Sequence, residues 1–366
     1  MTTPPALRSQ AVDWLAMRFS MDRRPILIGP WRSEVGFEAL YWRPFLTELG
    51  KRVPDFWNRA VVVTRGGGVN LYGRMDVVKS GESGTSATWW QPTAVDLYSL
   101  RSVEDIRRQN LFDWSKTQLQ KQTRVTDYDR QLLRDAADSA GITGRYHVLH
   151  PSWMYWALAP FWDEHRGLRY LLSLTDYSLL PRPVPPITID GLPSTYVAVK
   201  FYGRATWPHP NQETMAFVAS VVGNIAKQAP VLLLNSGHEG DEHIDMTVTG
   251  PNIFVLPKLP PEHNLGVQMA LLGRAQCFVG TYGGVAQAAL RMGVPSASFW
   301  SEFGGTAHAH LSLSSWLSKQ SNVPFVTGSL NDAGLWRQML IAPQAPVGTG
   351  GVGPDGALTS GSAVPV

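Results

Sequence analysis

The stretch FVGTYGGVAQAALRMGVPSASFW, residues 278–300, decides the fold, because it joins two apolar segments through a glycine-rich turn and a helix of small residues. The first apolar segment, 277–279, runs directly into the turn at 280–284, and the second covers 296–300. A strand that returns as a parallel neighbour needs a crossover, which is usually a helix. The stretch therefore predicts a parallel βαβ unit with helices packed on the sheet.

The same alternation extends along the rest of the second half. Apolar strand segments are expected at 196–202, 231–235, 252–257 and 323–327, with amphipathic helices between them. The first half repeats the pattern more loosely, with strands expected at 24–30, 60–64 and 146–151. Strands that alternate with helices predict an α/β fold with parallel sheets. We divide the chain into a first domain at 1–180, a Pro-rich linker at 181–194, a second domain at 195–342 and a disordered tail at 343–366.

Composition limits the functional classes. The chain has 366 residues, 44% of them hydrophobic and 17% charged, and a formal net charge of +3. That charge is too small to indicate a nucleic-acid partner. No apolar run approaches the roughly 20 residues that span a bilayer, and the N-terminal residues lack a signal peptide, so we expect a cytoplasmic protein. Contact with a membrane surface stays open. Cys277, the single cysteine, fits a buried thiol.

The turn at 280–284 has the features of an anion site. Ligands of open parallel sheets bind beyond the carboxyl ends of the strands, where the N-terminus of a helix attracts phosphate. Gly280, Gly283 and Gly284 would let the backbone approach a diphosphate, while Thr281 offers a hydroxyl and Tyr282 an aromatic face. The alternative is a tight strand-to-helix turn without a ligand, since the pattern is not a strict G-x-G-x-x-G.

Two other strand ends lie on the same predicted edge. Lys200 ends the first strand of the second domain and Arg204 follows it, so both could hold a diphosphate. The loop NSGHEGDEH, 235–243, brings Asn235 and His238 to this edge, where they could contact a ribose, base or sugar. Solvated loops are the alternative for both segments. Because the acidic and histidine residues of 235–243 lack a recognised ligand spacing, we expect no metal site there.

In the first half, Glu34 and Glu38 are four residues apart and can share one face of a helix that begins after the first strand. The helix dipole favours carboxylates there, and one ionised carboxylate could act as a general base. Charge stabilisation of the helix end is the alternative. Arg65 and His150 end the next strands on this edge, as acceptor-side contacts or, for His150, as a rival base. Arg65 could instead simply turn the chain, and His150 could be a structural histidine.

The second half resembles the donor-binding half of glycosyltransferases of the GT-B type. The resemblance rests on the Lys200/Arg204 strand end, the 235–243 loop and the run VLPKLPPEHNLGVQMALLGRAQCFVGTYGGVAQAALRMGVP. In heptosyltransferase- and fucosyltransferase-like members, a run of the form aDxFVGTxSGxAxxAxxxGVP carries the phosphates of the nucleotide. Here Gly283 stands where Ser or Pro is common, and 275–276 lack the usual acidic residue. The segment GPWRSEVGFEALYWRPFL, 29–46, resembles the GxxxxExGxE opening of some bacterial glycosyltransferase-like proteins.

This resemblance implies two Rossmann-like domains with parallel sheets that face a cleft. It also implies a glycosyltransferase that takes a nucleotide-diphosphate sugar as donor substrate, by a metal-independent, inverting mechanism and without a cofactor. The acceptor would be a glycan, a lipid-linked or a small-molecule hydroxyl, as in the assembly of cell-envelope glycans. A nucleotide-sugar epimerase or hydrolase and a noncatalytic nucleotide-sugar-binding protein are the alternatives. A nicotinamide oxidoreductase fits less well, because neither half has the dinucleotide fingerprint.

Overall fold

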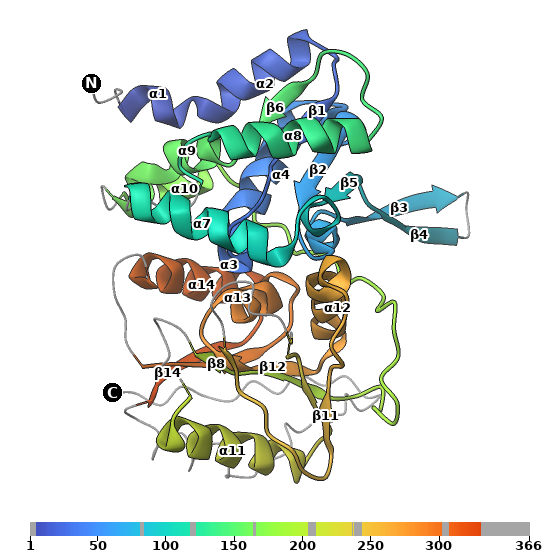
Figure 1. The fold of residues 1–366 in the computed structure, drawn as a ribbon, viewed down its shortest axis with the longest axis vertical. Coiled ribbons are helices and arrows are strands. Elements are labelled where there is room, and N and C mark those ends of the chain that lie inside the picture. Colours follow the sequence, from blue (N-terminus) through green and yellow to red (C-terminus); the bar gives the residue numbers. More distant parts are fainter. Residues whose placement is uncertain are drawn as a thin grey trace, which may run out of the picture.

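The computed structural model describes residues 5–80, 84–117, 122–163, 166–203, 210–235, 237, 244–301 and 307–330. These residues form two α/β lobes, one above the other in Figure 1, and each lobe contains a parallel sheet. The predicted α/β class with two Rossmann-like parallel sheets is thereby confirmed. The tail predicted to be disordered, 343–366, lies outside the described residues.

The N-terminal sheet has four strands in the order β5-β2-β1-β6, and every neighbouring pair is parallel. Its strands are β1 (Ile26–Ile28), β2 (Ala60–Thr64), β5 (Thr93–Asp96) and β6 (His147–Leu149). Alternate residues of these strands enter two different hydrophobic clusters: Leu27 packs with α8 (Asp127–Ser139), whereas Ile26 and Ile28 pack with α2 (Ala11–Met21). Both faces are therefore covered, which explains the nearly continuous apolar strands.

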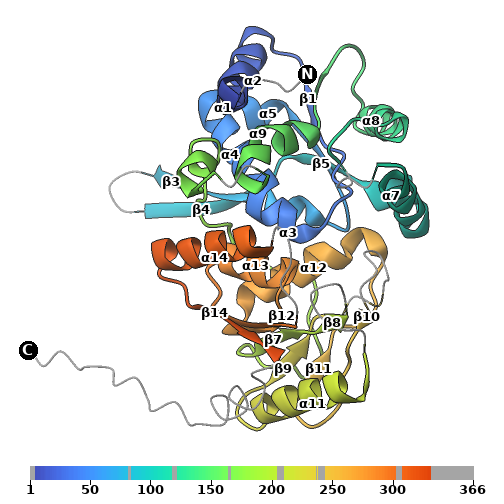
Figure 2. The same ribbon diagram turned by 90° about the vertical axis from the view of Figure 1, so that its left-hand side faces the viewer.

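The remaining elements of this lobe surround the sheet. They are α1 (Pro5–Ser9), α3 (Val35–Phe37), η1 (Glu38–Trp42), α4 (Arg43–Arg52), α5 (Phe56–Arg59), η2 (Gly68–Leu71), β3 (Arg74–Ser80), β4 (Gly84–Trp90), α6 (Leu97–Leu100), α7 (Val103–Thr117), α9 (Ser152–Trp162) and α10 (Leu168–Leu172). Strands β3 and β4 form an antiparallel hairpin that projects from the lobe (Figures 1 and 2). The sequence indicated only mixed structure there, and it also missed β5, because none of these three strands contains an unbroken apolar run.

The C-terminal sheet has six parallel strands in the order β11-β9-β7-β12-β13-β14. The strands are β7 (Val197–Lys200), β9 (Val231–Leu233), β11 (Ile253–Val255), β12 (Cys277–Thr281), β13 (Ser296–Trp300) and β14 (Phe325–Ser329); β8 (Tyr202–Gly203) and β10 (Ile244–Asp245) form a separate short pair. Counted along the chain within this sheet, the order is 3-2-1-4-5-6, the order of a dinucleotide-binding fold. The strand order reverses between β7 and β12.

The helices of this lobe lie on both faces of its sheet. They are α11 (Gln212–Ala226), α12 (Pro261–Arg274), α13 (Gly284–Arg291) and α14 (Ala307–Ser321). Helix α11 covers the outer face, while α12, α13 and α14 lie between the sheet and the N-terminal lobe (Figures 1 and 2). Asn211 caps α11, and its side chain accepts a hydrogen bond from the Thr214 amide.

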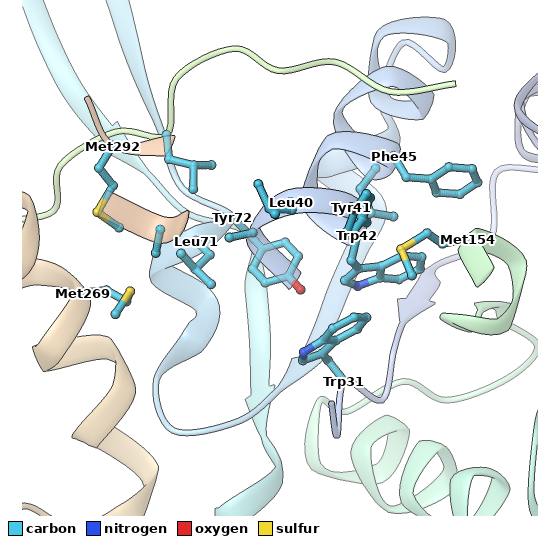
Figure 3. Close-up of a cluster of buried hydrophobic side chains, with 14 of the residues drawn as sticks. Trp31, Leu40, Tyr41, Trp42, Phe45, Leu71, Tyr72, Met154, Met269 and Met292 are labelled. Carbon is cyan, nitrogen blue, oxygen red and sulfur yellow. The ribbon is translucent and has the colours of Figure 1, made fainter. Parts of the chain in front are cut away.

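One hydrophobic cluster spans the two lobes. Met269 of α12 and Met292, just after α13, lie in the same buried cluster as Leu40 and Leu71 of the N-terminal lobe (Figure 3). The connection from α10 to β7, residues 173–196, contains no helix or strand and includes the predicted linker at 181–194. None of the described helices is long and apolar enough to cross a membrane.

Candidate active site

The point where the C-terminal strand order reverses lies at Lys200 and Gly280. These residues are paired in the register of β7 and β12, near the carboxyl ends of both strands. Ligands of open α/β sheets bind at such a position. The structure thus brings Lys200 and the 280–284 turn, which are far apart in sequence, to one edge of one sheet.

The glycines of the turn are required by close packing inside the protein. A Cβ on Gly280 would overlap the carbonyl oxygen of Lys200, and a Cβ on Gly283 would overlap the hydroxyl of Tyr202. Sequence reasoning had given two explanations for these glycines: the approach of a ligand and a tight strand-to-helix turn without a ligand. Gly283 is also the N-cap of α13 and supplies no side-chain cap. The backbone N–H groups in the first turn of α13 therefore donate no hydrogen bond to an N-cap side chain.

Thr281 and Tyr282 point into the protein. The Thr281 hydroxyl is fully buried, accepts a hydrogen bond from the Tyr202 amide at 3.1 Å and lies 3.3 Å from the Tyr202 carbonyl oxygen. The Tyr282 ring is buried and packs edge-on against Phe325, with ring centroids 6.3 Å apart. Both side chains hold the turn in place. A direct contact of either side chain with a donor stays a prediction.

Lys200 is also buried. Its Nζ donates a hydrogen bond to the Leu234 carbonyl at 2.6 Å and lies 3.2 Å from Asp245 Oδ1. Burial lowers the pKa of this amine, and the neighbouring carboxylate acts in the opposite direction. In this structure the amine links β7 to β9 and β10, so its predicted contact with a donor phosphate would need another arrangement of these partners.

Two of the predicted donor contacts, Arg204 and His238, lie outside the described residues. Asn235 is described and buried at the end of β9. Its Nδ2 donates to Thr247 Oγ1 at 2.7 Å, and its Oδ1 has no hydrogen-bond partner among the described residues.

Helix α3 of the N-terminal lobe packs directly on the N-terminus of α13 (Figure 2). A Cβ built on Gly36 would lie 3.0 Å from the Gly284 Cα, and one built on Gly284 would lie 2.5 Å from Val35 Cγ1. Backbones this close leave room only for glycine on both sides. The GxxxxExGxE segment and the 280–284 turn, read separately from sequence, therefore meet.

Glu34 lies at this junction. It is the N-cap residue of α3 and is half-buried. Burial is the largest influence on the pKa values of Tyr155, in the N-terminal lobe, and His310, in α14. The negative charge of Glu34 acts on both groups as well: it adds to the raised pKa of Tyr155 and partly opposes the lowered pKa of His310. His310 Nδ1 lies 2.6 Å from the Tyr41 hydroxyl, and burial lowers the pKa of His310 to about 4. Glu34 is thus a partly accessible carboxylate surrounded by groups from both lobes.

Glu38 is enclosed, in contrast to Glu34. Its side chain is fully buried, and its Oε1 accepts hydrogen bonds from the Tyr72 hydroxyl at 2.6 Å and the Thr64 hydroxyl at 2.9 Å. Its Oε2 has no hydrogen-bond partner among the described residues. Burial raises the pKa of Glu38 to about 7, although both hydrogen bonds and the charge of Arg65 lower it. Glu38 also begins the π-helical segment η1, a rare geometry that is frequent at functional sites.

Arg65 supports the segment that carries Glu34. Its Nε and Nη2 both donate to the Ser33 carbonyl, at 3.1 and 2.7 Å. The loop that follows it docks on α12, where the Gly266 amide donates to the Gly66 carbonyl at 2.7 Å. Arg65 therefore holds the backbone just before Glu34 and lies close enough to Glu38 to lower its pKa. Whether it also contacts an acceptor stays a prediction.

His150 belongs to a buried polar network. Its Nδ1 accepts from the Ser152 amide at 3.1 Å, and its Nε2 lies 3.5 Å from Asp129 Oδ2. Asp129 also accepts from Arg32 Nε at 2.8 Å. His150 Nε2 has no hydrogen-bond partner among the described residues, but the contacts of the ring all lie within the N-terminal lobe. This geometry fits the structural role that sequence reasoning had given as the alternative for His150.

Sequence reasoning missed three residues of this junction: Thr64, Tyr72 and His310. The two hydroxyls lie in segments without a recognisable motif, and His310 lies in an ordinary amphipathic helix. Only their packing against Glu38 and Tyr41 reveals them. Among the described residues, no group of three or more His, Cys, Asp or Glu side chains could hold a metal ion.

No family model matches the chain. No curated protein matches it either. Among solved structures, it is similar to a family 9 glycosyl transferase from Veillonella parvula, with a TM-score of 0.40, 12% identity and coverage of 87% of this chain and 90% of that one. It is also similar to the heptosyltransferase WaaC from E. coli, solved with ADP, with a TM-score of 0.38, 14% identity and coverage of 77% and 89%. Similarity this weak supports no argument about function, which must come from the site.

Proposed function

We propose that the protein is a glycosyltransferase that moves a sugar from a nucleotide-diphosphate donor to an acceptor hydroxyl. The diphosphate would bind at the N-terminus of α13, and Glu34 would act as the general base. The observation that carries this proposal is the contact of Gly36 with Gly284. It brings a half-buried carboxylate next to a helix N-terminus at the reversal point of a Rossmann-ordered sheet.

Helix α13 supports the donor half of this proposal. A glycine N-cap supplies no capping side chain to the first-turn N–H groups, and the helix dipole at this end favours an anion. The same charge distribution would stabilise the diphosphate as it leaves, because negative charge develops there in the transition state. The buried Thr281 and Lys200 would act by holding the turn, and Arg204 remains a predicted direct contact.

Glu34 is a better base than Glu38 because it is partly exposed, whereas Glu38 is fully buried and accepts two hydrogen bonds. In the proposed step, the acceptor oxygen attacks the anomeric carbon and its proton passes to Glu34. The bond between that carbon and the diphosphate breaks, and the nucleoside diphosphate leaves with the electron pair. A single displacement of this kind inverts the anomeric centre and needs no metal ion.

Glu34→Gln tests the assignment. The variant should bind donor as the wild type does but transfer sugar about 10²- to 10⁴-fold more slowly, the usual contribution of a general base. The donors would be UDP-, GDP- and ADP-sugars, each compared with its bare nucleoside diphosphate. Binding would be followed by thermal shift and transfer by release of the diphosphate with and without a mixed glycan acceptor pool.

Glu213→Gln is the matched control, since Glu213 is an exposed carboxylate in the first turn of α11. This variant should keep both binding and turnover. Equal turnover in Glu34→Gln and wild type would refute the base assignment. Diphosphate release that does not depend on an acceptor would indicate a hydrolase, and binding without any turnover would indicate a noncatalytic protein.

A further inference from the structure

A cavity lies at the other end of α13 from the proposed donor site. It has a volume of about 310 Å³. Its walls come from the connection between the lobes (Tyr177 and Leu179), from α13 (Leu290 and Arg291) and from α14, with Trp316 among the lining side chains. This volume is at the lower end of the range for small-molecule sites.

Arg291 is the unusual residue in this cavity. Its side chain is only 2% exposed, and neither its Nε nor its Nη1 has a hydrogen-bond partner among the described residues. The guanidinium carbon lies 5.0 Å from the centroid of the Tyr177 ring. This cation–π contact stabilises part of the positive charge of Arg291. Burial lowers the pKa of Arg291 to about 10, so the group remains a cation at neutral pH. A buried cation with unsatisfied donors costs several kcal/mol unless an anion pairs with it.

The neighbouring groups do not meet this need. Asp176 is the carboxylate that acts on Arg291, but it is paired with Lys51 and accepts from the Ser178 amide at 2.7 Å. The carbonyl of Arg291 itself accepts from the Leu180 amide, and Arg182 donates to the Met292 carbonyl at the end of α13. These two backbone carbonyls at the end of α13 thus accept hydrogen bonds, whereas Nε and Nη1 of Arg291 have no hydrogen-bond partner among the described residues.

We propose that this cavity binds a small molecule that carries a carboxylate or phosphate group on a short apolar body. The guanidinium would attract the oxyanion by its charge, and a rotation of the side chain would have to turn the buried Nε or Nη1 toward the cavity before either could donate a hydrogen bond. Trp316, Leu179 and Leu290 would enclose the apolar part. A nucleotide-diphosphate sugar does not fit this description, because the walls are mainly apolar. The site is thus distinct from the proposed donor site and does not depend on it.

Titration calorimetry of the full chain tests the proposal. The probes are hexanoate, phenylacetate and hexyl phosphate, each with a neutral counterpart: hexanol, 2-phenylethanol and again hexanol. At least one anion should bind with 1:1 stoichiometry, and its neutral counterpart should bind about 10- to 100-fold more weakly. That ratio corresponds to the 1.5–3 kcal/mol of a charge-assisted hydrogen bond.

Arg291→Met should abolish this preference for the anion while the folded protein is retained, because Met fills a similar volume without a buried charge. Gln320→Trp, an exposed change at the rim, should block binding with the arginine still present. Lys319→Met removes an exposed charge from the same helix outside the cavity and should bind as the wild type does. Failure of all three anions to bind, or equal binding of anion and alcohol, would overturn the proposal. So would unchanged binding in both Arg291→Met and Gln320→Trp.

Discussion

Glu38 is a buried carboxyl group that costs stability and also links three segments of the N-terminal lobe. Its carboxyl group is fully buried, and only one of its two oxygens has partners among the described residues. The hydroxyls of Tyr72 and Thr64 connect it to η2 and β2, and Arg65 lies close enough to influence its charge. We therefore infer that Glu38 fixes the start of the helix behind Glu34.

The raised pKa of Glu38 predicts a pH-dependent stability. The folded protein keeps the proton up to about pH 7, whereas an unfolded glutamate loses it near 4.5, so the folded state binds more protons between these values. The free energy of unfolding should consequently fall as pH rises through this window, by roughly 3 kcal/mol from this one group. Glu38→Gln should not show this loss. Its free energy of unfolding, relative to that of the wild type, should therefore be higher at pH 8 than at pH 5.

Urea unfolding at pH 5 and pH 8 measures this effect. Glu104→Gln, an exposed carboxylate on α7, serves as the control and should follow the wild-type profile. If wild type and Glu38→Gln change in parallel between the two pH values, Glu38 does not carry a raised pKa in the folded protein.

The contact of α3 with α13 is the decisive relation between elements. Gly36 and Gly284 let the two helices approach until their backbones touch, and Gln287 of α13 lies against Gly36. This approach keeps the carboxylate of Glu34 beside the first turn of α13. Because neither backbone can give way easily, a single methyl group at either position would separate the two helices.

Gly284→Ala should therefore lower both stability and activity. The new Cβ would meet the Gly36 amide nitrogen at 2.7 Å, and relief of such overpacking typically costs ~1–3 kcal/mol. Gly223→Ala in α11 is the matched control, because a Cβ there meets nothing within 4 Å and alanine is the better helix former. Urea unfolding should show a lower stability for Gly284→Ala and an equal or higher stability for Gly223→Ala than for wild type. Donor turnover should fall only in Gly284→Ala. A fully stable and active Gly284→Ala would show that the helices are not in contact.

At the scale of the whole molecule, the two sheets are separate, but one hydrophobic cluster contains residues of both lobes. One buried cluster runs from β1 and α4, through η2, to α12 and α13 (Figure 3). The loop after β2 adds polar contacts, including a hydrogen bond from Asn70 Nδ2 to the Gly266 carbonyl at 3.0 Å. An interface that is continuous with the core should not open independently of it.

Calorimetry should accordingly show one cooperative unfolding transition for the described lobes, with equal calorimetric and van't Hoff enthalpies. Gly266→Val should lower its midpoint, because the added side chain would press on the Gly67 carbonyl, 2.6 Å from the position of a Cβ. Two resolved transitions in the wild type would mean that the lobes unfold as independent domains.

The sequence by itself determined the α/β class and the strands of the C-terminal sheet, because apolar runs and glycine turns are local signals. It also predicted Glu34 and the 280–284 turn as candidates. Tertiary structure alone decided what these residues touch: the pairing of β7 with β12, the burial of Lys200, Thr281 and Glu38, and the contact of Gly36 with Gly284. Burial and long-range contact depend on how separate elements pack, and no local pattern encodes that.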